Sequence, residues 1–246
     1  MSKILGDWLV STYRAKDCDL SVTDITKPTY QLWMQLHTTM EDKEEKQVGM
    51  KSFIGSAVHK AIEDQDEDGV VKEFSWVRTL PDGTRIGGTA DELRWRYSIQ
   101  KWRLGDVKTK GLYSAKKFMG IGTKANPNPK PEQEKEILQM SVYRWLFEGM
   151  FDIEDKGVIY LIIPGHNSYD PIPEYSEVWL DLMPIKTVDQ YIKGKLSLAK
   201  GDTEPDCDCN RDWMCNYCPF WESCSKYKGK KDKEERCRKG FTDEGK

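Results

Sequence analysis

The sequence predicts an α/β protein, with a mixed β-sheet flanked by helices and a small cysteine-ligated metal module near the C-terminus. Three observations predict this fold. The hydrophobic patterns run in the order helix, three strands, helix and buried strand. The length of 246 residues suits one large domain with a small appendage. Six of the seven cysteines crowd into residues 207–237, which favours metal ligation over disulfides in a chain without a secretory signal.

The helices are predicted from apolar residues at helical spacing and from start signals. Ser21-Val22-Thr23-Asp24 is typical of a helix start and leads into an apolar stretch that ends near Leu36. In the second helical pattern His59 and Glu63 are four residues apart, so they share one face. The strongest pattern follows Pro131. Helices are therefore predicted over residues 21–36, 51–64, 132–151 and 186–200.

The strands are predicted from runs rich in Val, Ile, Phe and Trp. Pro81-Asp82-Gly83 supplies a turn between the first two strands. The run Gly157–Ile163 is almost continuously apolar, as expected of a strand buried on both faces. Gly111–Pro131, rich in Gly, Lys and Pro, is predicted to be a mobile loop. Strands are predicted over residues 70–80, 85–97, 100–109, 157–163 and 174–182.

The predicted hairpin of the second and third strands brings two acids together. If its loop is centred on Ser98-Ile99, Asp91 lies opposite Asp106 on one face, with the side chains roughly 5 Å apart. An odd-length loop would send the acids to opposite faces, and Ser-Ile is a poor tight-turn pair. Two carboxylates this close repel each other unless a cation lies between them.

Asp106 and Lys108 share a strand face, so a carboxylate and an ammonium reach the same edge of the sheet. Two Asp side chains and the carbonyl of Val107 suit Mg²⁺, a hard cation that takes oxygen ligands. A ligand from His59 would favour Mn²⁺, because imidazole suits softer metals. A lysine beside such a cation stabilises charge on a phosphate, so this combination of residues indicates phosphodiester cleavage.

The ordered motifs resemble those of the RecB-type branch of the PD-(D/E)XK nuclease superfamily, which has a restriction-endonuclease-like fold. The resemblance covers about residues 20–225. It implies that Asp91, Asp106 and Lys108 are catalytic and that Gln139 and Tyr143 bind the substrate strand. It also implies metal ligation by His59, Asp91, Asp106 and the carbonyl of Val107. The matching motifs are His59, Gly88-Thr89-Ala90-Asp91, Asp106-Val107-Lys108-Thr109 and Gln139-x3-Tyr143.

Cys215, Cys218 and Cys224 form a C-x2-C-x5-C triplet that needs a fourth ligand. Four thiolates bind either Zn²⁺ or a [4Fe–4S] cluster. The iron–sulfur members of the superfamily, the CRISPR-associated RecB-like and AddB nucleases, end in a similar triplet, and this resemblance favours a cluster with a structural role. Their fourth cysteine lies well upstream, where this chain has none, so Cys209, Cys207 and Cys18 are alternatives for that position.

The amino-acid composition limits the possible cellular location and binding partners of the protein. The mean hydropathy of −0.72 and the lack of an apolar run near 20 residues indicate a soluble protein without a membrane partner. The N-terminus does not resemble a secretory signal, so a cytoplasmic location is expected. A net charge of −3 argues against a protein that coats nucleic acid, but a local basic groove suffices for a nuclease. The candidate basic residues are Lys101, Arg103, Lys108, Lys110, Lys116, Lys117 and Lys124.

These patterns give one functional expectation and one alternative. The expectation is a metal-dependent DNA nuclease, an exonuclease that acts on a free or single-stranded DNA end. The alternative is a catalytically silent module that binds nucleic acid or assembles with partners while keeping the nuclease fold. The expected organisation is an N-terminal helical segment (1–48), a nuclease core (49–200), a cysteine module (201–226) and a charged tail (227–246).

Overall fold

The computed structural model describes residues 18–38, 67–122, 126–164 and 172–209, together with residues 55, 57, 58, 60, 218, 220 and 224–226. The predicted helix over 51–64 lies largely outside the described residues, and so does His59. The chain forms two compact units. The first contains Met1–Thr26 and Glu44–Gln190, and the second contains Lys27–Lys43 and Tyr191–Lys246. Contacts thus group residues 27–43 with the C-terminal segment, an association that is not apparent from the linear order.

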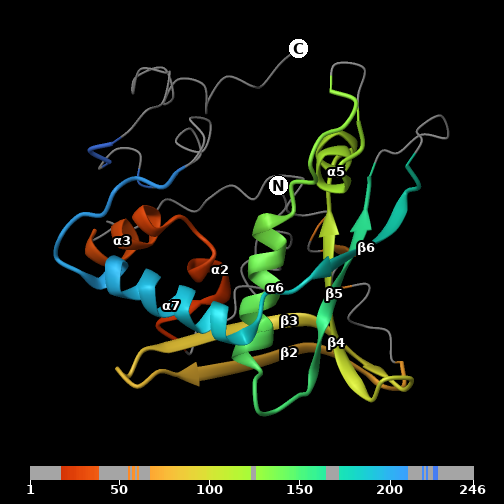
Figure 1. The fold of residues 1–246 in the computed structure, drawn as a ribbon, viewed down its shortest axis with the longest axis horizontal. Coiled ribbons are helices and arrows are strands. Elements are labelled where there is room, and N and C mark those ends of the chain that lie inside the picture. The colour runs from red at the N-terminus through yellow and green to blue at the C-terminus, as the bar shows by residue number, and fades with distance from the viewer. Residues whose placement is uncertain are drawn as a thin grey trace, which may run out of the picture. The chain divides into compact units, whose positions relative to one another are not determined.

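A six-stranded sheet forms the centre of the first unit (Figure 1). The strands are β1 (Leu20–Ser21), β2 (Val70–Thr79), β3 (Arg85–Arg96), β4 (Lys101–Thr109), β5 (Ile153–Ile162) and β6 (Tyr175–Asp181). β3 is antiparallel to β2 and β4, and β6 is antiparallel to β5. β1 is parallel to β3, and β5 is parallel to β4. The predicted mixed sheet is confirmed, and the bounds of four of its five predicted strands agree to within one residue; β5 begins four residues earlier than expected.

The two hairpins have identifiable causes. At the β2–β3 turn the Asp82 carboxylate accepts hydrogen bonds from the backbone N–H and the hydroxyl of Thr84, and Gly83 adopts the φ of +85° that favours glycine. The β3–β4 pairs run from Arg96 opposite Lys101 to Glu92 opposite Gly105. That is the register predicted from a loop centred on Ser98-Ile99.

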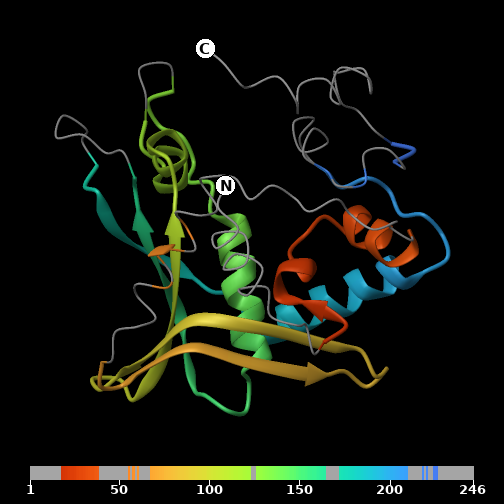
Figure 2. The same cartoon turned by 180° about the vertical axis from the view of Figure 1, so that it is seen from behind.

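Helices of the first unit flank the sheet. The short helix α2 (Val22–Ile25) begins in a capping box, in which Ser21 and Asp24 satisfy each other's backbone N–H groups. The long helix α6 (Glu134–Leu146) packs on β2, β3 and β4 and against α2 (Figure 2). Its buried residues include Met140 and Trp145. Beyond Leu146 the predicted helix gives way to a turn, where Gly149 has a φ of +86°.

Two predictions about helices were wrong. The mobile loop predicted for Gly111–Pro131 contains α5 (Leu112–Met119), because Ala115 and Phe118 lie three residues apart and are both buried. The helix predicted over residues 21–36 is two helices, α2 and α3 (Thr29–His37). The chain breaks between them at Pro28, which cannot donate the backbone hydrogen bond of a continuing helix.

The second unit has its own small apolar core. Tyr30 and Met34 of α3 pack with Phe220, and Trp33, Cys207, Cys218 and Cys224 cover this cluster. The N-terminus of α3 is capped from far along the chain: the Asp208 carboxylate accepts the N–H groups of Thr29 at 2.7 Å and Tyr30 at 3.1 Å. Helix α7 (Ile185–Lys200) precedes the cysteine segment. In the part of the chain that the structure describes, no helix is long and apolar enough to cross a membrane.

Candidate active site

The site begins where β3 and β4 separate. β2 pairs with β3 from Arg85 to Arg94, so β1 and β4 must share the other edge of β3, one at each end. The β3–β4 ladder stops at Glu92, one residue before Asp91. From there the Asp91 carboxylate bridges the strands, accepting the Val107 N–H at 2.8 Å. The carboxylate therefore takes the place of a ladder hydrogen bond, directly beside Asp106.

Asp106 and Lys108 form an ion pair at this point. The Lys108 ammonium lies 2.9 Å from Oδ1 and 2.8 Å from Oδ2 of Asp106, whose side chain is 7% exposed. Burial lowers the pKa of Lys108, but the charge and hydrogen bond of Asp106, with further attraction from Asp91 and Glu136, hold the pKa above its ordinary value. Lys108 is therefore an ammonium ion at neutral pH.

A second ion pair lies just beyond the end of β4. Lys110 follows Lys108 at the strand spacing of two and donates to the buried Glu136 of α6 at 2.7 Å. The Lys110 ammonium also lies 4.8 Å from the ring centroid of Phe118. These contacts tie the end of β4 to α5 and to the first turn of α6. Lys110 was predicted only as a basic surface residue, and Glu136 was not predicted at all.

Gln139 and Tyr143 lie one turn apart on α6, as their spacing requires, and their side chains hydrogen-bond. The Tyr143 ring packs so closely on Gly88 that a Cβ there would lie 2.7 Å from the ring. Burial raises the pKa of Tyr143, and the charges of Asp106, Asp91 and Glu73 raise it further. Tyr143 is thus a neutral phenol held beside the two aspartates, and Gly88 is required for its approach.

Glu73 is an acidic neighbour that sequence reasoning missed. The β2–β3 pairing passes from Lys72 opposite Glu92 to Phe74 opposite Ala90 and skips Glu73. Glu73 has a φ of +51°, a strained conformation for a residue with a side chain. A strand irregularity of this kind leaves no signal in hydrophobic alternation, so only the structure shows that its charge acts on the site.

The donor set agrees in kind with a hard divalent cation, because Asp91, Asp106 and the Val107 carbonyl all offer oxygen. Within the described ranges no group of three His, Cys, Asp or Glu side chains is arranged to hold a metal ion. The described residues therefore supply two carboxylates and one main-chain carbonyl. The remaining predicted ligand, His59, lies outside the described residues.

The opposite face of the sheet carries a separate charged network. Glu92 accepts the Tyr160 hydroxyl at 2.6 Å and the Arg94 guanidinium at 3.0 Å. The Tyr160 ring reaches Glu92 by crossing Gly105, where a Cβ would lie 2.7 Å from the ring. Because alternate residues of a strand face opposite sides, this network is separated from Asp106 and Lys108 by the sheet.

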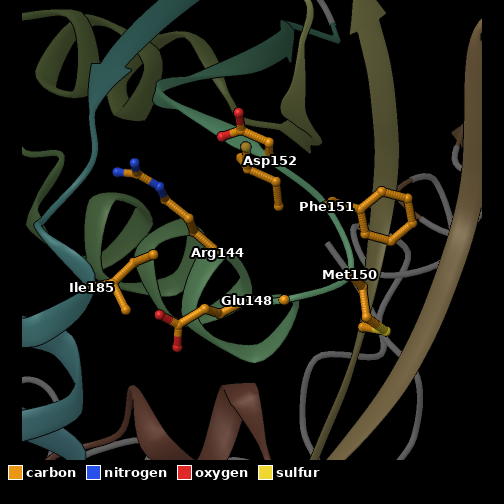
Figure 3. Close-up of a pocket in the computed structure, with 8 residues that line it drawn as sticks. Arg144, Glu148, Met150, Phe151, Asp152 and Ile185 are labelled. Atoms are coloured by element: carbon orange, nitrogen blue, oxygen red, sulfur yellow. The ribbon is translucent and has the colours of Figure 1, made fainter.

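A cavity of about 400 Å³ lies at the other end of α6 (Figure 3). Arg144, Glu148 and Asp152 contribute charged side chains to it, and Phe151 and Ile185 contribute apolar ones. Glu148 lies 3.2 Å from Arg78 and Asp152 lies 3.3 Å from Lys101, so each acid has a basic neighbour. The described lining includes neither Asp91 nor Asp106.

The second unit gathers cysteines around its core. Burial raises the pKa of Cys209 to about 12, with contributions from its hydrogen bond to Cys207 and from nearby Cys218. The Cys224 thiol lies 3.8 Å from the Tyr30 hydroxyl, to which it donates. Cys18 belongs to the first unit, where it packs against Gly87. None of the described cysteines forms a disulfide, and Cys215 lies outside the described residues.

The cysteine arrangement suits a metal in its donor chemistry. Because its pKa is raised, the Cys209 thiol stays protonated at neutral pH, and a bound metal ion would displace that proton. Cys209 lies near Cys207 and Cys218, and Cys207, Cys218 and Cys224 pack on the same apolar cluster. This proximity supports either Cys207 or Cys209 as the fourth ligand. It gives no such support to Cys18.

Comparisons with known proteins bear on the fold alone. No family model matches the chain, and no curated protein matches it. A solved structure titled "Crystal structure of SSO0001" is similar, with a TM-score of 0.55 over 91% of this chain and 95% of that chain. The sequence identity is 18%. The class defined by the fold is therefore a mixed α/β protein with a six-stranded sheet flanked by helices.

Proposed function

We propose that the protein is a divalent-metal-dependent deoxyribonuclease with the restriction-endonuclease-like fold of the RecB-type PD-(D/E)XK nucleases. One observation carries the proposal. The β3–β4 pairing ends at Glu92. Beside this end lie the carboxylates of Asp91 and Asp106 and the ammonium of Lys108. A protein that only bound nucleic acid would not need this trio, which disfavours the catalytically silent alternative.

Asp91, Asp106 and the Val107 carbonyl would hold Mg²⁺ or Mn²⁺ in this proposal. The cation would supply charge neutralisation at the phosphate and a more acidic water molecule. Hydrolysis adds water across a P–O bond, so the hydroxyl goes to phosphorus and the proton ends on the leaving oxygen. Because the pKa of Lys108 is raised, this residue stays charged and stabilises negative charge on the phosphate, rather than acting as a base.

The decisive experiment is digestion of an end-labelled DNA strand. We expect cleavage with Mg²⁺ or Mn²⁺, no cleavage in EDTA, and recovery when the cation is restored in excess. Stepwise loss from one end would support an exonuclease, and internal fragments an endonuclease. Binding of DNA without cleavage under any of these cations would favour the silent module.

Gln139 and Tyr143 would position the scissile strand. Tyr143→Phe keeps the ring over Gly88 and removes only the hydroxyl beside Asp91 and Asp106. We expect cleavage to fall about tenfold, as for a lost hydrogen bond to a charged group, while the affinity for Mn²⁺ measured by calorimetry is unchanged. A collapse of Mn²⁺ affinity would mean that the hydroxyl supports the carboxylates instead of the substrate.

The cysteines of the second unit would hold a [4Fe–4S] cluster with a structural role, with Zn²⁺ as the alternative. Cys215, Cys218 and Cys224 would be three of its ligands, and Cys209 or Cys207 the fourth. Asp208 stands between these last two and caps α3. Metal binding at the cysteines would therefore also stabilise that helix.

A further inference from the structure

The segment that follows the active-site strand has an unusual charge. Residues 107–131 contain six lysines and no Asp or Glu, in a chain whose formal net charge is −3. The lysines are Lys108, Lys110, Lys116, Lys117, Lys124 and Lys130. A block of one sign beside an acidic site is the electrostatic footprint expected of a surface that holds phosphates.

Helix α5 gives this segment a defined surface. Ala115 and Phe118 are completely buried, and Gly120 ends the helix with a φ of +67°. Tyr113 is 67% exposed, with its ring in solvent. The Lys117 ammonium lies 5.1 Å from the centroid of that ring. The helix therefore presents an aromatic ring and a cation together on its outer side.

Two lysines of this segment are paired with buried acids, whereas Lys117 and Lys130 keep their charge available. Lys108 and Lys110 are neutralised by the buried Asp106 and Glu136. Lys117 reaches Glu132 only at 3.6 Å, with both side chains open to solvent, and such pairs contribute little. Lys130 is exposed. Positive charge thus remains at Lys117, beside the Tyr113 ring, and at the exposed Lys130. Tyr113 itself lies seven residues beyond Asp106.

We propose that α5 and the segment that follows it bind single-stranded nucleic acid, with Tyr113 stacking on an unpaired base and Lys117 and Lys130 contacting phosphates. Aromatic rings flanked by cations hold single strands in this way, because every base has a face on which a ring can stack. Bases within a duplex do not offer that face. The inference rests on the proposed function and assigns a binding surface to it: Tyr113 and the lysines beside it hold the unpaired strand that is cut at Asp106 and Lys108.

Fluorescence anisotropy of a labelled oligothymidylate in EDTA tests the inference without cleavage. We expect Tyr113→Ala to weaken binding about 5- to 150-fold, the range for one stacked base, and Tyr113→Phe to bind like the wild type. The matched control is Tyr97→Ala. Tyr97 is 74% exposed in the β3–β4 turn, at the other end of β4, and its replacement should leave the affinity unchanged.

An abasic strand of the same length separates stacking from charge. On that strand the wild type and Tyr113→Ala should bind equally, because no base remains to stack. The inference would be overturned if Tyr113→Ala bound oligothymidylate within twofold of the wild-type affinity. It would also be overturned if Tyr113→Ala lost as much affinity for the abasic strand as for oligothymidylate. A protein that shows the stacking effect but cuts no DNA with Mg²⁺ or Mn²⁺ would keep this inference and lose the proposed nuclease activity.

Discussion

Replacing Asp106 with Asn is expected to lower DNA cleavage by about 10²- to 10⁴-fold, and Lys108→Ala by a similar factor. The Asn side chain keeps the shape of Asp106 but removes the negative charge that would hold the cation. The Ala side chain removes the ammonium that stabilises charge on the phosphate. The measurement is the initial rate of digestion of an end-labelled strand at saturating Mg²⁺, with DNA affinity in EDTA as the companion readout.

A matched control and a double variant make this result interpretable. Lys156→Ala removes another strand lysine paired to an aspartate, Asp181 at 2.7 Å, but on the exposed surface. We expect it to cut DNA like the wild type. Removing one partner of the Asp106–Lys108 pair leaves a charge without its counterion and lowers stability. The double variant, which combines Asp106→Asn with Lys108→Met, removes both charges. That double variant should regain thermal stability without activity; undiminished cleavage by Asp106→Asn would refute the assignment.

Cys218→Ser is expected to remove the metal from the second unit and to lower its melting temperature, because ligation energy contributes to folding energy in such sites. Wild-type protein purified without oxygen should be brown. We expect broad absorbance near about 400 nm and about four irons per chain if the centre is a cubane cluster. Elemental analysis decides between the metals: stoichiometric zinc without iron or sulfide would replace the cluster by a zinc site.

Cys18→Ser is the matched control for this experiment. Cys18 is a free thiol that packs against Gly87 in the first unit, so its loss should leave the metal content unchanged. Cys209→Ser and Cys207→Ser, compared side by side, identify the fourth ligand as the one whose loss reduces metal content. Metal loss in Cys18→Ser would place the fourth ligand upstream instead. None of these outcomes affects the nuclease proposal, which depends on Asp91, Asp106 and Lys108.

The β3–β4 hairpin illustrates what could be predicted without the structure. A loop centred on Ser98-Ile99 predicted one register and an odd-length loop predicted another, and the observed pair of Glu92 with Gly105 agrees with the first. The strand period is a local feature, but the turn residues were too weak a signal to choose between the two registers. The residue motifs also placed Gln139 and Tyr143 on one helix face, since a spacing of four is one turn. Their roles stay predictions.

Helix α5 illustrates why local pattern fails. Gly, Lys and Pro dominate residues 111–131, and the buried pair Ala115 and Phe118 was too short a signal against that composition. Whether so short a stretch is helical depends on the surface that covers its apolar side, because a helix of eight residues is marginal in water by itself.

The sequence by itself determined strands β2 to β6, helices α6 and α7, and the order of the chemical motifs, and it limited the hairpin register to two alternatives. Only the tertiary structure decided which distant groups are in contact. Asp91 accepts the Val107 N–H, Lys110 donates to Glu136, and Asp208 caps the N-terminus of α3. The physical reason is a difference in range. The periodicity of a strand or helix depends on residues that are close in the sequence, whereas these contacts depend on where separate elements pack. Many packing arrangements are compatible with the same local pattern.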